Sequence, residues 1–244
     1  DVNGSAGSPA PGNGGGLHVS GPAKTSFTDS LVGGNEAARE GGGLWNGSGI
    51  MTVDGTSLDS NDAQGNGSAN GGGGLFNSGG TLIVQNGTTI TDNTATGTSG
   101  SGGGILNNDG TLTVNDSTID GNIAMRAGGG IEVRGTSAKT TLTNVNLDNN
   151  TTGSSPGNGG GLHITGTSNS TITGGTVNMN IAASEGGGLW NGAGIMTIDG
   201  TTIDGNTAIK TAFLGGGGLF NNGGTLNISN GAIINDNQAL NGGG

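Results

Sequence analysis

The sequence predicts an all-β fold, a right-handed parallel β-helix that forms a three-faced β-solenoid of about eight rungs. A glycine-rich entry recurs at steps of 26 to 31 residues, and its third glycine stands at Gly16, Gly43, Gly74, Gly104, Gly130, Gly161, Gly188 and Gly218. A repeat of this length is typical of a solenoid. Apolar residues alternate over short runs with the strand period of two. Glycine, 60 of the 244 residues, breaks any helical run.

The repeating unit is clearest over residues 186–208, GGGLWNGAGIMTIDGTTIDGNTA. Its alternation predicts short strands at 189–191, 195–198 and 201–204, separated by Gly and Asp-Gly turns. Each rung buries one thin apolar row against the next rung, so 29% hydrophobic residues suffice for a core. The whole chain is therefore expected to form one solenoid domain, with rungs at 14–40, 41–70, 71–101, 102–127, 128–158, 159–185, 186–214 and 215–241.

A longer repeat of five rungs lies over the short one. GNGGGLHVSG at Gly12 returns as GNGGGLHITG at Gly157, an offset of 145 residues. Residues 1–13 resemble the tail of rung five, and residues 242–244 begin a ninth entry. We expect either a piece chosen for expression or a segment of a longer repeat protein or filament.

Three inward apolar columns are expected, one per strand. The first column is Leu17, Leu44, Leu75, Ile105, Ile131, Leu162, Leu189 and Leu219. The second is Phe27, Met51, Leu82, Leu112, Leu142, Ile172, Met196 and Leu226. The third is Val32, Leu58, Ile90, Ile119, Leu147, Val177, Ile203 and Ile234.

An asparagine follows the third-strand apolar residue by three positions in every rung. Asparagine tolerates left-handed turn geometry, and stacked amides form hydrogen-bonded ladders. We therefore assign a structural role to the column Asn35, Asn61, Asn93, Asn122, Asn150, Asn180, Asn206 and Asn237.

This motif carries a family resemblance. An apolar residue, two others, Asn, one other and Ala stand as LDSNDA, ITDNTA, IDGNIA, IDGNTA and INDNQA, followed by a glycine entry or the chain end. The pattern resembles the FxxN and GGAI repeats of polymorphic outer-membrane proteins, and more widely bacterial surface proteins with right-handed parallel β-helix repeats. It departs from them in having Leu, Ile or Val for Phe and Gly for the Ala of GGAI. The resemblance implies secretion or surface display and implies no ligand.

Composition restricts the partners. Six Lys and Arg against 17 Asp and Glu give a net charge of −11, which excludes a basic nucleic-acid surface. No apolar run reaches the length of a membrane span, and residues 1–13 do not have the charged-then-apolar pattern expected of a signal peptide. The chain has no cysteine, so no disulfide supports the fold.

An aromatic-rich column follows the inward residue of the first strand, and period two places it outside. We expect either an exposed strip that binds a glycan or protein, or a second small core covered by glycine-rich loops. The candidate strip is His18, Trp45, Phe76, His163, Trp190 and Phe220; Leu106 and Glu132 complete the column.

Threonine rows on the second strand give an alternative surface. Thr-x-Thr recurs in three successive rungs, and regular rows on a flat face resemble ice-binding β-helices, although threonine also simply suits exposed strands. The residues are Thr52, Thr111, Thr113, Thr141, Thr143, Thr171, Thr173 and Thr197.

Aligned carboxylates in the third strand give a weak candidate for Ca²⁺. They are Asp59, Asp120, Asp148 and Asp204, for which a solvated acidic face is the simpler interpretation. No other cofactor is expected.

These patterns predict an extracellular or cell-surface structural or adhesive module, without enzymatic activity. We expect it to bind a surface glycan or protein, or to self-associate by end-to-end or lateral stacking. The alternatives are an ice-binding β-helix and, third, a polysaccharide-acting β-helix enzyme.

Overall fold

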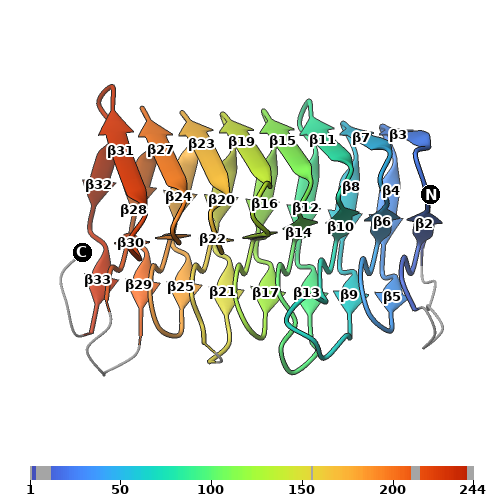
Figure 1. The fold of residues 1–244 in the computed structure, drawn as a ribbon, viewed down its shortest axis with the longest axis horizontal. Coiled ribbons are helices and arrows are strands. Elements are labelled where there is room, and N and C mark those ends of the chain that lie inside the picture. The colour runs from blue at the N-terminus through green and yellow to red at the C-terminus, as the bar shows by residue number, and fades with distance from the viewer. Residues whose placement is uncertain (1, 4–11, 155, 210–214, 241–244) are drawn as a thin grey trace.

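Four parallel sheets run along a solenoid in the computed structural model, which describes residues 2–3, 12–154, 156–209 and 215–240 (Figure 1). The parallel β-solenoid predicted from the sequence is confirmed, and no described residue is helical. Consequently, this part of the chain holds no helix that could cross a membrane. The expected repeat relationships of residues 1–13 and 242–244 fall largely or wholly outside the described residues.

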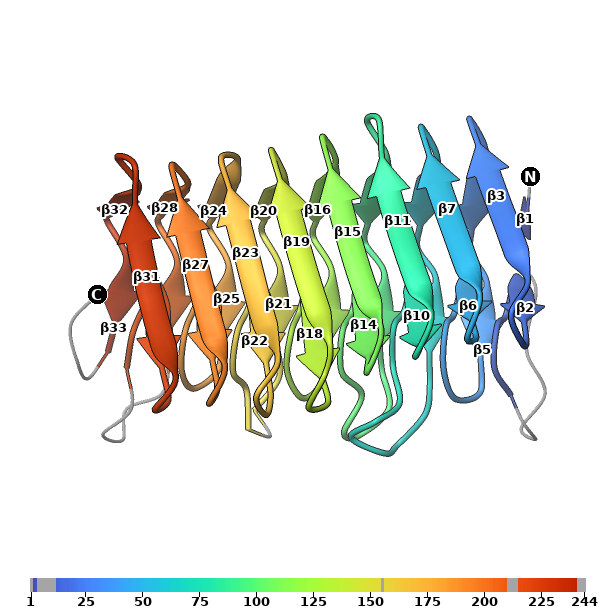
Figure 2. The ribbon, with the colours of Figure 1, turned by 45° about the horizontal axis from the view of Figure 1, so that its top comes forward.

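Each turn of the chain contributes one strand to each sheet in the order I, II, III, IV. Sheet I is β2 (Leu17–Val19), β6 (Leu44–Asn46), β10 (Leu75–Ser78), β14 (Ile105–Asn108), β18 (Ile131–Arg134), β22 (Leu162–Ile164), β26 (Leu189–Asn191) and β30 (Leu219–Asn221). Sheet II, the long strands at the front of Figure 2, is β3 (Lys24–Thr28), β7 (Ile50–Asp54), β11 (Thr81–Gln85), β15 (Thr111–Asn115), β19 (Lys139–Thr143), β23 (Asn169–Thr173), β27 (Ile195–Asp199) and β31 (Thr225–Ser229).

Sheet III has one additional strand, because β1 (Val2–Asn3) pairs with β4 (Leu31–Gly33). Its other strands are β8 (Ser57–Asp59), β12 (Thr89–Thr91), β16 (Thr118–Asp120), β20 (Asn146–Asp148), β24 (Thr176–Asn178), β28 (Thr202–Asp204) and β32 (Ile233–Asn235). Sheet IV, of two-residue strands, was not predicted: it is β5 (Glu36–Ala37), β9 (Asp62–Ala63), β13 (Thr94–Ala95), β17 (Ile123–Ala124), β21 (Thr151–Thr152), β25 (Ile181–Ala182), β29 (Thr207–Ala208) and β33 (Gln238–Ala239).

Sheet IV explains the alanine and the glycines of the repeat motif. The alanine is the inward residue of each short strand except β21, and Ala37, Ala63 and Ala124 are fully buried. After sheet IV, the glycine entry passes close to other backbone segments. A Cβ on Gly42 would lie 2.4 Å from the carbonyl oxygen of Gly73 and 2.5 Å from that of Asp62. Only glycine permits this approach.

The inward columns of sheets I and III follow the predicted alignment. Leu44, Leu75 and Ile105 stack in register in sheet I, and Leu58, Ile90 and Ile119 do so in sheet III. All six are completely buried in one hydrophobic core.

The predicted register of sheet II is wrong at three rungs. Phe27 pairs with Val53, Leu142 with Val114 and Ile172 with Ile198, so these side chains belong to a second inward column. The first inward column contains Thr25, Thr140 and Ser170 at those rungs instead, paired with Met51, Leu112 and Met196. The cause is a longer turn between sheets I and II in these rungs, which advances the apolar residue by one inward position.

The expected asparagine column forms a ladder inside the turn between sheets III and IV. Asn93 Nδ2 donates to Asn122 Oδ1 at 3.0 Å, and Asn122 Nδ2 donates to Asn150 Oδ1 at 2.9 Å. The Asn122 side chain is completely buried. The left-handed residue is the one before each asparagine, such as Met179 with φ 54°, so tolerance of left-handed geometry is not what places asparagine in the column.

A second asparagine column, not predicted from the sequence, closes the strands of sheet I. Asn46 Nδ2 donates to Asn77 Oδ1 and Asn77 Nδ2 to Asn107 Oδ1, both at 2.8 Å. Asn77 also caps its own turn by donating to the Gly80 carbonyl oxygen at 3.0 Å. The recurrent third letter of LWN, LFN and ILN is the signal that could have predicted it. The three rungs with long turns have Val19, Val133 or Ile164 at this position instead.

Candidate functional site

The aromatic-rich column on the outer side of sheet I is continuous in the structure. Strand pairing places His18, Trp45, Phe76 and Leu106 in consecutive register, followed by Glu132, His163, Trp190 and Phe220. The five residues from Phe76 to Trp190 are buried, with exposed fractions of 0 to 7%. Trp45 and Phe220 are half-buried, and His18 is exposed. The expectation of an exposed strip is therefore wrong for its middle, which forms a second small core.

The glycine entry makes this burial possible. The first glycine of each entry has a left-handed backbone, with φ 65° at Gly41, so the chain folds back over the following strand. A Cβ at Gly41 would lie 3.1 Å from Trp45 Cβ. The residue before the glycine forms its own ladder of bridges, from Asn13 and Glu40 to Asn158 and Glu185. Strand alternation identifies the two faces of sheet I but gives no sign of this additional layer.

The aromatic rings follow one another along the rod in two copies of one pattern, stacked in every pair except His163 with Trp190, which are tilted by 35°. Ring centroids of His18 and Trp45 lie 4.1 Å apart, and those of Trp45 and Phe76 lie 6.1 Å apart. The second copy repeats this with His163, Trp190 and Phe220 at 4.3 and 6.4 Å. Such pairs stabilise by about 0.5–1.5 kcal/mol beyond their buried area. The three rungs that occur in both copies of the longer repeat thus share one arrangement of rings.

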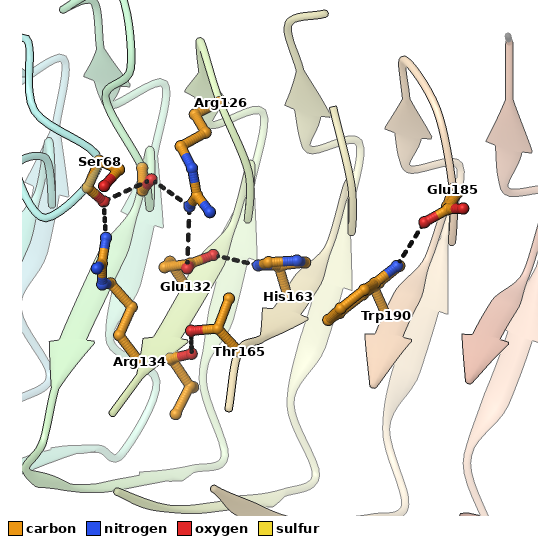
Figure 3. Close-up of polar contacts among 10 residues, drawn as sticks. Ser68, Arg126, Glu132, Arg134, His163, Thr165, Glu185 and Trp190 are labelled. Carbon is orange, nitrogen blue, oxygen red and sulfur yellow. Dashed lines mark hydrogen bonds and ion pairs between the residues drawn. The ribbon is translucent and has the colours of Figure 1, made fainter. Parts of the chain in front are cut away.

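Each tryptophan has a dedicated hydrogen-bond acceptor. Trp190 Nε1 donates to Glu185 Oε2 at 2.9 Å, and Trp45 Nε1 donates to Glu40 Oε2 at 3.1 Å (Figure 3 shows the former). In each pair the glutamate is the residue just before the glycine entry. A buried indole N–H needs such a partner, so the glutamates belong to the packing of this layer.

The middle of the column contains a buried charged network that was not predicted. Glu132 is completely buried, and its Oε2 lies 2.6 Å from His163 Nδ1 while its Oε1 lies 3.3 Å from Arg126 Nη1 (Figure 3). Arg126 also donates to Ser101 Oγ at 3.0 Å. These side chains link three successive turns. The signal in the sequence is that Glu132 is the one acidic residue in an otherwise aromatic, apolar and histidine column.

Arg134, at the end of β18, lies beside this network. Its Nη1 donates to the Ser68 carbonyl oxygen, which ties the 65–70 loop to the middle of the rod (Figure 3). Burial lowers the pKa of the Arg134 guanidinium, an effect that the Glu132 carboxylate opposes. Its Nε atom is buried without a hydrogen-bond partner.

The predicted threonines lie on the outer side of sheet II, in a different alignment from the expected one. Thr113, Thr141, Thr171 and Thr197 form one uninterrupted column, and Ile83 separates Thr113 from Thr52. Thr143 and Thr173 form a second column with Asn115, whereas Thr111 pairs with Lys139. The expected threonine rows are thus displaced by one outward position. The cause is the same longer turn between sheets I and II that displaces the inward residues of sheet II.

The aspartate column lies on the outer side of sheet III, where Thr91 and Asn178 interrupt it. Only Asp120 and Asp148 are direct neighbours. Asp148 accepts hydrogen bonds from Thr176 Oγ1 and from the Asn178 backbone N–H. Burial raises the pKa of Asp148. Among the described residues, no three His, Cys, Asp or Glu side chains are grouped so that they could hold a metal ion.

Comparison of the chain with protein-family models, with curated proteins and with solved structures gives no match.

Proposed function

We propose that the protein is an extracellular or cell-surface structural module, a stiff rod that displays repeated side chains to a glycan or protein. The observation that carries this proposal is the outer side of sheet II. Its five-residue strands are the longest in the rod and lie in unbroken register over eight rungs (Figure 2). Threonine occupies one outward column at four successive rungs, Thr113, Thr141, Thr171 and Thr197.

The mechanism is multivalent display. Successive rungs repeat at about 4.8 Å, so an identical weak contact recurs along the rod. A ligand that itself repeats, such as a polysaccharide chain, engages several contacts at once and gains avidity without a deep pocket. The asparagine ladders and the second core on the outer side of sheet I support this mechanism, because they hold the rungs at a fixed spacing.

The surface location rests on the repeat motif. The apolar-x-x-Asn-x-Ala pattern and the glycine entries support membership among surface-displayed β-helix proteins, of which the polymorphic outer-membrane proteins are the specific resemblance. Fractionation of the producing cells, with an antibody against the rod, tests this location directly.

A second candidate function is ice binding. The observation that favours it is the strand register of sheet II, which places four threonines in one outward column. The alignment predicted from the sequence does not place these four together. Threonine is β-branched, so its hydroxyl and methyl groups are held in one orientation along the column. Thermal hysteresis of the purified protein tests this candidate.

One set of variants tests the proposed surface. Thr141→Asp with Thr171→Asp places two charges in the sheet II column. The matched control is Thr89→Asp with Thr118→Asp, a registered pair facing outward on sheet III. We expect binding to a polysaccharide panel or to cells to be lost in the first variant and kept in the control. Equal binding by both variants would contradict the proposal, and release of shortened saccharides would indicate the enzyme alternative.

A further inference from the structure

The outer side of sheet IV divides into two chemically different halves. Its first outward column, in register, is Glu36, Asp62, Thr94, Ile123, Thr151, Ile181, Thr207 and Gln238. A second outward column lies two residues further along each turn. Backbone hydrogen bonds between successive turns define it as Gln64, Thr96, Met125, Gly153, Ile209 and Leu240, while Ala183 has the equivalent position in the sixth rung.

Large apolar side chains are exposed in the C-terminal half of this face. The exposed fractions are 42% for Ile123, 40% for Met125, 38% for Ile181, 48% for Ile209 and 59% for Leu240. We call these five residues the apolar strip. From the fourth rung to the eighth, neither column contains a charged residue among the described positions. Large exposed apolar side chains that gather on one face in this way usually mark an interaction site.

In the first three rungs, the same face carries two carboxylates, Glu36 and Asp62, within a group of hydrogen-bonded polar side chains. Asp62 accepts from Thr94 Oγ1 at 2.9 Å and from Thr96 Oγ1 at 2.9 Å, and Gln64 Nε2 donates to Glu36 Oε2 at 3.5 Å. Asp120, Asp148 and Asp204, in the fourth, fifth and seventh rungs, lie on sheet III and not on this face. In a chain with net charge −11, two copies repel wherever Glu36 and Asp62 of one copy face those of the other.

We propose that the apolar strip is a dimer interface, on which a second copy of this chain packs in the antiparallel direction. A two-fold axis parallel to the strands, passing beside Ile181, sets the fourth rung of one protomer against the eighth rung of its partner. The same axis keeps the acidic first two rungs of the two protomers at opposite ends of the assembly, so Glu36 and Asp62 of one protomer do not face those of its partner. A second copy therefore fits the strip without bringing these carboxylates together.

The strip is also self-complementary under this symmetry, as an isologous interface requires. Ile181 lies opposite its own symmetry equivalent, Met125 lies opposite Leu240, and Ile123 lies opposite the side chain of Gln238. Small residues lie opposite large ones in the fifth and seventh rungs, where Gly153 meets Ile209. This inference is independent of the ligand surface on sheet II, because the two sheets form different faces of the rod (Figure 1).

Cysteine cross-linking tests the interface, since the chain contains no cysteine of its own. Ile181→Cys places single thiols next to the two-fold axis, and mild oxidation is expected to give a disulfide-linked dimer. Ile50→Cys is the matched control, because Ile50 is also 38% exposed but faces outward from sheet II. Equal cross-linking of the two variants would overturn the proposal.

Sedimentation equilibrium over a concentration series gives the second measurement. We expect the wild type and Ile50→Asp to dimerise alike, and Ile181→Asp to raise the dimer dissociation constant at least tenfold with an unchanged circular dichroism spectrum. A wild type that stays monomeric at every concentration overturns the proposal. So does a wild-type mass that grows without limit, which indicates end-to-end stacking.

Discussion

Glu132 Oε2 and His163 Nδ1 lie 2.6 Å apart on the outer side of sheet I, and both side chains are at most 2% exposed. A carboxylate at this depth is stable only with hydrogen-bonding and charged partners. Arg126 supplies a second contact from the preceding turn. The layer that covers the outer side of sheet I is therefore a core. We expect substitutions among Arg126, Glu132 and His163 to lower its stability most.

Removal of Arg126 tests this network. We expect Arg126→Met to lower the free energy of unfolding in urea by about 2–3 kcal/mol, because it leaves Glu132 buried with a single partner. The value is below that of a fully buried pair because 17% of the Arg126 side chain is exposed. The triple variant Arg126→Met, Glu132→Leu, His163→Phe restores an apolar column like Phe76 and Leu106, and is expected to be about as stable as the wild type. A triple variant no more stable than the single one would contradict this account.

The asparagine ladder is expected to be sensitive in its middle. Asn122→Ala removes the amide oxygen that accepts from both the backbone N–H and the side chain of Asn93. It also removes the side-chain donor to Asn150 Oδ1, which keeps only the backbone N–H of residue 122. Since each unsatisfied buried group costs about 1–3 kcal/mol, we expect a loss of at least about 2 kcal/mol in chemical denaturation. Asn146→Ala, at an exposed position in the adjacent rung, is the control and should change stability by less than about 0.5 kcal/mol. Similar losses for both would argue against the ladder.

The displaced register of sheet II leaves two buried hydroxyls in the core without partners, Thr140 Oγ1 and Ser170 Oγ. Thr140 is 2% exposed between Leu112 and Ser170. Thr140→Val keeps the side-chain shape and removes the unsatisfied hydroxyl, so we expect the free energy of unfolding to rise by about 1 kcal/mol. The same change at Thr141, which faces outward, should have little effect. Destabilisation by Thr140→Val in thermal or urea unfolding would show that the hydroxyl has a partner in solution, such as a bound water.

The pH dependence of two aspartates should have opposite signs. Burial raises the pKa of half-buried Asp148 above its ordinary value of 3.8, so the folded state binds more protons than the unfolded state just above that pH. Stability is then lost as pH rises through this window. We expect Asp148→Asn to stabilise the protein at pH 7, by less than about 1 kcal/mol after solvent screening, and to have no such effect below pH 3.8.

Asp54 provides the contrast. Hydrogen bonds from Gln85 and Asn86 lower its pKa, so its carboxylate contributes stability above its ordinary pKa that is lost as pH falls through the folded value. Asp54→Asn should therefore be destabilising at neutral pH and neutral in strong acid. Parallel pH–denaturation curves of the two variants measure both effects, and curves of the same sign would contradict the assignment.

The sequence by itself determined the repeat and the cores of sheets I and III, including the asparagine ladder. Leu44, Leu58 and Asn61 recur at positions that every rung keeps, so alternation and spacing suffice to align them. Sheet II was harder, because the turn that precedes it changes length where Val19, Val133 and Ile164 replace asparagine. In these rungs the apolar residue lies two residues further along the strand than the predicted alignment requires. A displacement of two residues keeps a side chain on the inward face but changes its partners in the neighbouring strands, so alternation alone does not reveal it.

Only the tertiary structure decided the environment of the outer column and of sheet IV. Period two places Trp190 on the outer side of sheet I, but the glycine entry of its own rung folds back over that side. Because this covering layer forms where the chain reverses direction, it leaves no periodic pattern in the sequence. The partners Arg126, Glu132 and His163 come from three turns, so their contact depends on the stacking of rungs. The apolar strip has the same origin: Ile123, Ile181 and Ile209 are far apart in the chain and share one face because parallel pairing stacks their rungs in the same sheet.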